Sequence, residues 1–182
     1  MSGSGTRDAL VQAGIALLEE TGSTEIGLRE IARRAGVSHG APRRWFPTRK
    51  ALLGALAEVG LRDLALTLAA AGDSRDADIT EWARAYIEFA WARPAVFTLI
   101  FRHDLLEGSG AGLRSVSTPL FERLVTQVRN TRPELDPLTT ATALWVGVHG
   151  IAVLSTTGAL TLAAPGVDID DLIRRVVRDA LG

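Results

Sequence analysis

The residues that could do chemistry in this sequence gather in one short, strongly basic segment. Between Ile26 and Lys50 the 182-residue chain carries seven basic side chains and one acid, which gives the segment a net charge of +6. The basic residues are Arg29, Arg33, Arg34, Arg43, Arg44, Arg49 and Lys50. Residues 60–182 carry 12 arginines against 15 acids. This asymmetry favours an anionic partner at one end of the chain, although on charge alone a solvated arginine-rich face explains the pattern equally well.

Residue sets that carry out catalysis are missing from the sequence. There is no cysteine, which excludes disulfides and thiolate chemistry. His39, His103 and His149 are far apart and lack the spacing of metal ligands. The adjacent His103 and Asp104 would point in different directions on a helix. We find no paired carboxylates for acid–base catalysis, no nucleophile with its base and no phosphate-binding loop. We therefore expect no enzyme activity, metal or cofactor.

The basic segment has the pattern of a helix-turn-helix. An apolar stripe predicts a short helix from about Leu28 to Ala35, with small alanines where a second helix could cross it steeply. Gly36 can adopt the positive φ that the tight turn needs, and Ser38 can cap a second helix that runs toward Trp45. A generic helical hairpin would share these features, but it would not need the basic residues that follow. The combination therefore favours DNA binding through the second helix in the major groove.

Helical periodicity continues along the rest of the chain, so the elements that position this segment are helices as well. We expect an all-α fold of about nine helices, with no alternating strand pattern and no internal repeat. Capping residues predict helix starts near Thr6, near Thr48, near Asp136, and near Asp168 or Asp170. A polar segment, residues 72–78, is the best candidate break between the long helix that starts at Thr48 and the helices after it.

Targeting signals are not evident. The start, Met1-Ser-Gly-Ser-Gly, lacks a basic region followed by an apolar run, so we expect no signal peptide and a cytoplasmic protein. The stretch from Leu138 to Ala164 has no charged residue, which raises a membrane span as an alternative. It is rich in Thr and Ser, is interrupted by Gly158 and lacks flanking basic anchors. We therefore expect a buried helix and no membrane partner.

Several spaced motifs stand in the first third of the chain. They are Glu19-Glu20-Thr21-Gly22, Leu28-Arg29-Glu30-Ile31-Ala32, Ala35-Gly36-Val37-Ser38-His39-Gly40-Ala41, Phe46-Pro47-Thr48 and Ala51-Leu52-Leu53. Through these motifs about residues 6 to 56 resemble the TetR family of bacterial repressors, and the resemblance is specific because several spaced motifs agree. The body is similar to the Trp-His-Gly subclass of TetR C-terminal domains, through the element Trp145 to Gly150 and the aromatic segment Phe89 to Phe101 before it.

The resemblance implies a DNA-binding domain over residues 1–47 and a ligand-binding and dimerisation domain over residues 48–182. It implies base and backbone contacts near the start of the second helix and phosphate contacts beyond it. The expected DNA-binding residues are Ser38, His39, Gly40, Ala41, Arg43, Arg44, Trp45, Thr48, Arg49 and Lys50. Trp45 could instead be a packed core residue, and Arg33 and Arg34 more often solvate the outer face.

Three residues depart from the family pattern. Arg43 stands where the family often has Tyr, so it can keep a phosphate contact but loses apolar contact with a thymine methyl group. Pro42 stands where Leu is favoured, and it would clash with the preceding turn in a helix capped by Ser38. The second helix should therefore begin nearer His39 or Gly40, or have a distorted first turn. Gly27 replaces the usual Ser or Thr cap and should cap the helix from Leu28 to Ala35 more weakly.

The body holds most of the aromatic residues, which suits either an ordinary helical core or a small-molecule pocket. With the family resemblance we favour the pocket, and His149 is either a ligand contact or a packed core residue. The expected ligand-binding residues are Trp82, Tyr86, Phe89, Phe97, Phe101, Phe121, Trp145 and His149. In the resembled family the last two long helices pair with their copies. The corresponding dimer-interface residues are Ala143, Gly147, Gly150, Leu154, Leu172 and Val176.

The sequence therefore predicts a dimeric, ligand-responsive regulator of the repressor type. It would bind a two-fold operator in double-stranded DNA as a homodimer and be released by a largely apolar small molecule. One alternative is a DNA-binding regulator without a small-molecule ligand, controlled by a protein partner, which a pocket filled by its own side chains would favour. A second is a small-molecule-binding protein or enzyme that uses the aromatic pocket.

Overall fold

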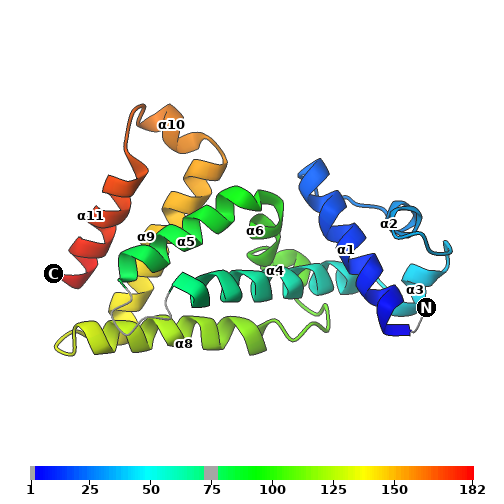
Figure 1. The fold of residues 1–182 in the computed structure, drawn as a ribbon, viewed down its shortest axis with the longest axis horizontal. Coiled ribbons are helices and arrows are strands. Elements are labelled where there is room, and N and C mark those ends of the chain that lie inside the picture. The colour runs from blue at the N-terminus through cyan, green and yellow to red at the C-terminus, as the bar shows by residue number, and fades with distance from the viewer. Residues whose placement is uncertain (1–2, 72–77) are drawn as a thin grey trace. The chain divides into compact units, whose positions relative to one another are not determined.

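A computed structural model describes residues 3–71 and 78–182, and within these ranges the regular structure is entirely α-helical (Figure 1). The predicted all-α class is confirmed, with eleven helices in the described ranges. The count exceeds the expected one because α7 (His103–Leu106) and α10 (Ala159–Ala163) are single turns that periodicity does not detect. The predicted break at residues 72–78 lies, except for Asp78, outside the described residues.

The chain divides into two compact units, and the first comprises residues 1–62 and 93–113. Its helices are α1 (Gly3–Thr21), α2 (Leu28–Arg34), α3 (Ala41–Trp45), the first part of α4 (Arg49–Ala71), α6 (Pro94–Ile100) and α7. Apolar side chains that are almost fully buried form its core, among them Leu10, Leu18, Ile31, Leu52 and Leu53. We call this unit the head unit.

Local signals set most of the boundaries in the head unit. Gly22 ends α1 with a φ of 64°, and the Thr48 hydroxyl caps α4 by accepting a hydrogen bond from the backbone N–H of Ala51 at 3.0 Å. The predicted cap at Thr6 is wrong, because α1 already begins at Gly3. No proline or acidic turn residue interrupts the chain upstream of Thr6, so the helix continues through it.

Glycines on α1 and α4 leave room for the side chains of neighbouring elements in the head unit. A Cβ atom on Gly14 of α1 would lie 2.9 Å from Leu56 Cδ2 on α4. A Cβ atom on Gly54 would lie 2.6 Å from the Ser109 side chain in the loop after α7, and one on Gly60 would overlap Val96 of α6. The first part of α4 is therefore the element against which α1, α6 and this loop pack.

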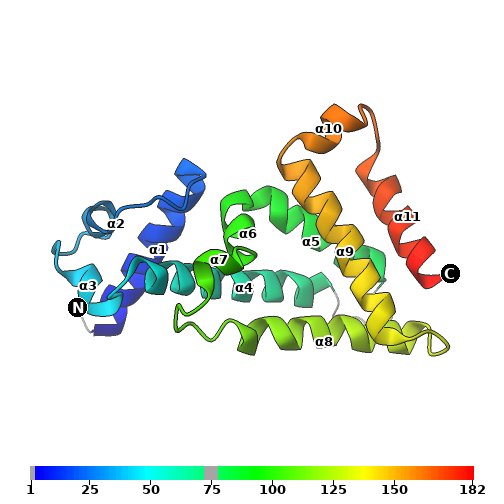
Figure 2. The ribbon, with the colours of Figure 1, turned by 180° about the vertical axis from the view of Figure 1, so that it is seen from behind.

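The second unit, which we call the body unit, comprises residues 63–92 and 114–182. Its helices are the end of α4, α5 (Ile79–Ala92), α8 (Arg114–Thr131), α9 (Pro137–Thr156), α10 and α11 (Ile169–Leu181), with α9 packed against α5, α8 and α11 (Figure 2). The predicted helix starts at Asp136 and Asp168 are confirmed. The Asp136 carboxylate accepts the backbone N–H of Thr139 at 2.8 Å, and Asp168 accepts those of Asp170 and Asp171.

The long uncharged stretch from Leu138 forms α9 and α10, separated by Gly158 at a φ of 75°. Of the described helices, α9 is long and apolar enough to cross a membrane by length and composition. Its inner face is buried, but its outer face exposes large apolar side chains, with Val146 59% and Leu154 46% exposed. In the single chain the neighbouring helices therefore cover one side of α9 only, and the exposed face includes Leu154, which was expected at a dimer interface.

The close approach at Gly60 predicts an unusual response to a helix-favouring substitution. Gly60→Ala should destabilise the protein by about 1–3 kcal/mol, because the added methyl group overlaps Val96 in a packed interface. Gly5→Ala, where nothing lies within 4 Å of the added Cβ, should instead stabilise α1 by up to about 1 kcal/mol. Urea unfolding of both variants measures the difference, and equal stabilisation by the two substitutions would contradict the described packing.

Candidate nucleic-acid interface

The turn between α2 and α3 has the backbone geometry that the sequence predicts. Gly27 precedes α2 with an extended backbone, and its carbonyl accepts the backbone N–H of Ile31 at 3.1 Å. Gly36 has a φ of 66°, and the next residue, Val37, donates its backbone N–H to the Ala32 carbonyl at 3.0 Å. The expected roles of Gly27 and Gly36 are confirmed, since a side chain at Gly36 would be strained at this positive φ.

The start of α3 follows from Pro42. The helix begins at Ala41 with Gly40 as its N-cap, so Pro42 lies in the first turn and is buried. Backbone N–H groups in a first turn have no helical acceptor, so a proline there removes no hydrogen bond. The predicted start near His39 or Gly40 is confirmed. The predicted Ser38 cap is wrong, because Ser38 uses its backbone carbonyl to accept the N–H of Ala41 at 3.0 Å and lies in the turn before the helix.

A groove of about 620 Å³ runs between the turn, α3 and the beginning of α1. Its lining residues are Thr6, Val37, Ser38, Gly40, Ala41, Arg44 and Trp45. The structure therefore brings together five of the expected DNA-binding residues around one concave surface. Sequence reasoning missed Thr6 as a member, because it treated this residue only as a helix cap. Trp45 was expected either to contact DNA or to pack in the core. It is half-buried and lines the groove, so both of these roles stay predictions.

The basic side chains near α2 and α3 differ in whether they form ion pairs. Arg43, Arg44 and Lys50 are exposed and form no ion pair with other described side chains, and His39 is exposed beside them. Arg33 and Arg34 instead pair with Glu30 and Glu20. The hydrogen bond from Arg33 holds the pKa of the Glu30 carboxyl below its ordinary value. The expectation that Arg33 and Arg34 occupy a solvated outer face agrees with these pairs.

Arg49 is held within the head unit. Its guanidinium donates to the Thr24 carbonyl at 2.5 Å and to the Glu25 carboxylate at 2.8 Å, which ties the start of α4 to the loop before α2. Thr48 likewise uses its hydroxyl to cap α4. Both residues were expected to hold phosphates, and that role stays a prediction. What the structure adds is that each already positions the backbone next to α3.

An acidic side chain, which sequence reasoning did not single out, connects α1 to α6. The Glu19 carboxylate accepts the backbone N–H groups of Ala95 and Val96 at 3.2 and 3.3 Å, and it lies 3.7 Å from the Arg93 guanidinium. The N-cap residue of α6 is Arg93, which makes no capping bond of its own. A helix that starts with Arg-Pro has no capping side chain of its own, so its first backbone N–H groups need an acceptor from another element. This missing cap is the sequence signal that could have predicted a contact such as that of Glu19.

The expected ligand-binding residues separate into two groups. In the body unit, the Trp82 ring stacks on the Tyr86 ring, with centroids 5.6 Å apart. The centroid of the His149 ring lies 6.2 Å from that of Tyr86 and 5.7 Å from that of Trp145. Phe121 lies 6.1 Å from Trp145 and extends the chain of rings. We call these five residues the aromatic chain. Phe97 and Phe101 instead pair at 5.2 Å in the head unit, and Phe89 is buried on α5.

The polar centre of the aromatic chain is the contact between Tyr86 and His149, whose Oη and Nδ1 atoms are 2.9 Å apart. Burial raises the pKa of the Tyr86 phenol, and a hydrogen bond from Trp145 opposes that rise. Burial lowers the pKa of the half-buried His149 below its ordinary value. Both shifts favour the neutral forms, so this is an uncharged polar pair in apolar surroundings.

The expected dimer-interface residues also take different positions. Ala143 and Leu154 lie exposed on α9, whereas Gly150 and Leu172 are half-buried. Gly147 packs against Val176 of the same chain, because a Cβ atom on Gly147 would lie only 2.7 Å from Val176 Cγ1. These two residues therefore join α9 to α11. Among the described residues no group of three or more His, Cys, Asp or Glu side chains could hold a metal ion.

Comparisons with known proteins agree with this architecture. Residues 79–180, more than half of the chain, match the family model of a tetracyclin repressor-like C-terminal domain. A protein of unknown function from Rhodococcus sp. RHA1 is 27% identical with a TM-score of 0.81, over 97% of this chain and 93% of that one. No curated protein sequence matches the chain.

Two solved structures with lower identity share the fold. The multidrug-binding protein EbrR, solved in complex with imidazole, is 23% identical with a TM-score of 0.68, over 97% of this chain and 89% of that one. The transcriptional regulator SCO7222 from Streptomyces coelicolor, described as a TetR, is 23% identical with a TM-score of 0.64, over 97% of this chain and 87% of that one.

The environment of His149 predicts a pH dependence of stability. Its folded-state pKa lies below the ordinary value of 6.5, so below that pH the unfolded chain binds more protons than the folded one. The contribution of His149 to stability is complete above pH 6.5 and is lost as the pH falls toward the lowered pKa. His149→Gln should therefore lose less stability than the wild type between about pH 7.5 and pH 5 in urea unfolding.

The exposed His103 provides the matched control. His103→Gln should keep the pH dependence of the wild type. If His149→Gln keeps it as well, the burial of His149 does not disfavour its protonated form.

Proposed function

The chain belongs to the TetR family of transcriptional regulators, and we propose that it is a dimeric repressor whose hold on its operator responds to a small molecule. The observation that supports this most directly is the groove beside α3, which is lined by the exposed Arg44, a cation without an ion-pair partner among the described residues. In this proposal the protein acts on DNA in the cytoplasm.

The α3 helix would enter the major groove of the operator. Its start at Ala41 places Ala41 and Pro42 at the N-terminal end, with His39 and Gly40 in the turn directly before it. His39 and Arg43 are exposed there, and we assign them to base edges and the adjacent backbone. Arg44 and Lys50 would bind phosphates. Arg49 and Thr48 would support this surface from α4 and reach the same phosphates only at its edge.

A second copy of the chain is the proposed occupant of the outer face of α9. Ala143, Val146, Val153 and Leu154 are exposed on it and none is charged, so in water it would remain an unpaired apolar surface. The exposed side of α11 carries ion pairs such as Arg174 with Asp171 and bounds this face with charge. A two-fold dimer buries the apolar face and provides two α3 helices for two half-sites.

An effector would bind in the body unit and favour a conformation whose two α3 helices no longer match the operator. The aromatic chain is the proposed site, where an apolar molecule with one polar group could replace the Tyr86–His149 hydrogen bond. Because α4 contributes residues to both units, it is the proposed connection to the head unit. Ligand binding by EbrR belongs to a protein with the same fold and supports this proposal by analogy only.

A second candidate function is supported by one observation. Trp82, Tyr86 and Phe89 are at most 5% exposed, so the chain's own atoms already surround these rings. Such packing favours a DNA-binding regulator that is controlled by a protein partner without a small molecule. Screening for compounds that release a selected operator duplex separates the two candidates, because only the first predicts a compound that acts on the isolated protein and DNA.

The proposed phosphate contact of Arg44 predicts a salt effect. Arg44→Ala should weaken binding to the operator and to unrelated duplexes by similar factors. It should also shallow the plot of log affinity against log salt concentration by about one unit. Arg33→Ala is the control, because Arg33 is paired with Glu30 on the outer face and should change the slope little. Loss confined to the operator would show instead that Arg44 reads bases.

The proposed dimer face predicts a change of oligomeric state. Val146→Glu should convert the protein to a folded monomer, because a charge would be buried against the second copy. Leu66→Glu changes an apolar residue that is 70% exposed on α4 and should leave the dimer intact. Light scattering after size exclusion gives the mass of each variant. A Val146→Glu protein that stays dimeric would exclude this face.

A further inference from the structure

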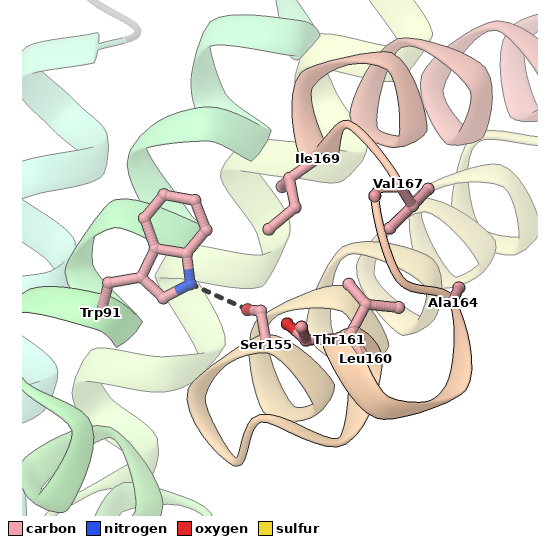
Figure 3. Close-up of a pocket in the computed structure, with 8 residues that line it drawn as sticks. Trp91, Ser155, Leu160, Thr161, Ala164, Val167 and Ile169 are labelled. Carbon is pink, nitrogen blue, oxygen red and sulfur yellow. Dashed lines mark hydrogen bonds between the residues drawn. The ribbon is translucent and has the colours of Figure 1, made fainter.

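A cavity of about 200 Å³ opens in the body unit at the ends of α5 and α9, away from the aromatic chain. Figure 3 shows the indole of Trp91 and the hydroxyl of Ser155 on one side, with Leu160, Val167 and Ile169 on the other. Thr161, Ala164 and Gly166 complete the lining. None of the residues that the sequence analysis assigned to ligand binding lies in this cavity, so it is a separate feature of the body unit.

The lining limits the kind of molecule that fits. No charged side chain lines the cavity, so an ionic ligand would lose hydration without gaining a partner. An enclosed apolar cavity of about 150 Å³ binds a molecule of the size of benzene. The cavity here has a similar volume, but it opens to solvent and its lining includes the hydroxyl groups of Ser155 and Thr161, so it suits a single aromatic ring with a small polar substituent. Trp91 is 46% exposed, which is unusual for so large an apolar side chain and leaves ring surface available for stacking.

The polar atoms at the cavity define the substituent. The Trp91 indole N–H donates to Ser155 Oγ at 2.8 Å, and Ser155 donates its own proton to the Ala152 carbonyl at 3.1 Å. A hydroxyl oxygen can accept two hydrogen bonds, so the Ser155 oxygen can accept one more. A ligand group placed here must therefore donate, as a hydroxyl group does. We propose that this cavity binds a small, uncharged aromatic alcohol, with its ring against Trp91 and its hydroxyl on Ser155.

The position of Trp91 in the chain connects this site to the head unit. Trp91 is the second-last residue of α5, and two residues later the Arg93–Val96 segment is held to α1 by Glu19. A ligand that moves the indole would act on a junction whose other end is fixed by the Glu19 carboxylate. This step rests on the proposed function, in which the head unit binds operator DNA, whereas ligand binding itself does not.

Titration with phenol, followed by the indole N–H signals in a nitrogen-correlated NMR spectrum, tests the site. Trp91→Phe identifies the Trp91 signal by its loss. Phenol should shift the Trp91 signal saturably, and benzoate, its charged counterpart, should not. Ala164→Leu, which fills the cavity, should weaken phenol binding by roughly tenfold. Ala163→Leu, the same change at an exposed neighbour on α10 outside the lining, should leave it unchanged.

Two further variants locate the ligand if Ala164→Leu disturbs folding. Ser155→Ala should weaken phenol by about fivefold and toluene not at all, because only phenol donates to Ser155. His149→Gln, in the aromatic chain, should leave phenol binding unchanged. The proposal is overturned if phenol does not shift the Trp91 signal, if benzoate binds equally well, or if His149→Gln rather than the cavity variants abolishes binding.

The connection is tested by the affinity for an operator duplex, selected from random DNA, with and without saturating phenol. Phenol should weaken operator binding by the wild type. Glu19→Gln should bind phenol and operator normally but lose most of the response to phenol. Phenol binding without any change in operator affinity overturns the connection and leaves the site and the DNA-binding function standing. Failure to select any operator overturns the proposed function, while the NMR result still decides the site.

Discussion

The head unit depends on one steric constraint, the absence of side chains where α4 meets its neighbours. Gly14 on α1 accommodates Leu56, and Gly60 on α4 accommodates Val96. A methyl group at either position would overlap a neighbouring side chain, so the packing there requires glycine. The start of α4 carries Thr48, Arg49 and Lys50, and this packing therefore also fixes the positions of three expected DNA-binding residues.

Some charged side chains of the head unit form contacts within the unit, and others are exposed without an ion-pair partner among the described side chains. Arg33, Arg34 and Arg49 have carboxylate partners within the chain, whereas Arg43, Arg44 and Lys50 have none among the described side chains. Glu19 uses its carboxylate on backbone N–H groups of α6. A segment of the tetracyclin repressor-like match, residues 93–113, is in this way part of the compact unit that contains the helix-turn-helix.

Local signals were enough to predict the helix-turn-helix. Pro42 excludes a helix that starts at Ser38, Gly36 is suited to a positive φ, and Asp136 and Asp168 are strong caps, because each of these effects acts within a few residues. The paired state of Arg49, the Glu19 contact with α6 and the cavity beside Trp91 could not be predicted. They join residues far apart in the sequence, and the periodicity of a helix shows which side is apolar but not what packs against it.

The aromatic residues expected at one ligand site lie in two separate units, and this too depends on contacts between residues far apart in the sequence. Phe97 and Phe101 belong to the head unit although they follow α5 directly in the sequence, because α6 packs on α1 and α4. The sequence grouped them with Trp145 and His149 because it contains no sign of that packing. The sequence likewise predicts a buried α9 without showing which of its residues the chain itself covers, since a helix rich in Leu, Val and Ala looks the same whether its own chain or a second copy covers it.

The central claim is that two copies of this chain place two α3 helices on one operator. Selection of bound duplexes from a random DNA pool tests it most directly. We expect enrichment of two inverted half-sites whose centres lie about 10 base pairs apart, which is one helical turn of DNA, or a multiple of that distance. No enriched sequence, or a single half-site without an inverted copy, would contradict the claim.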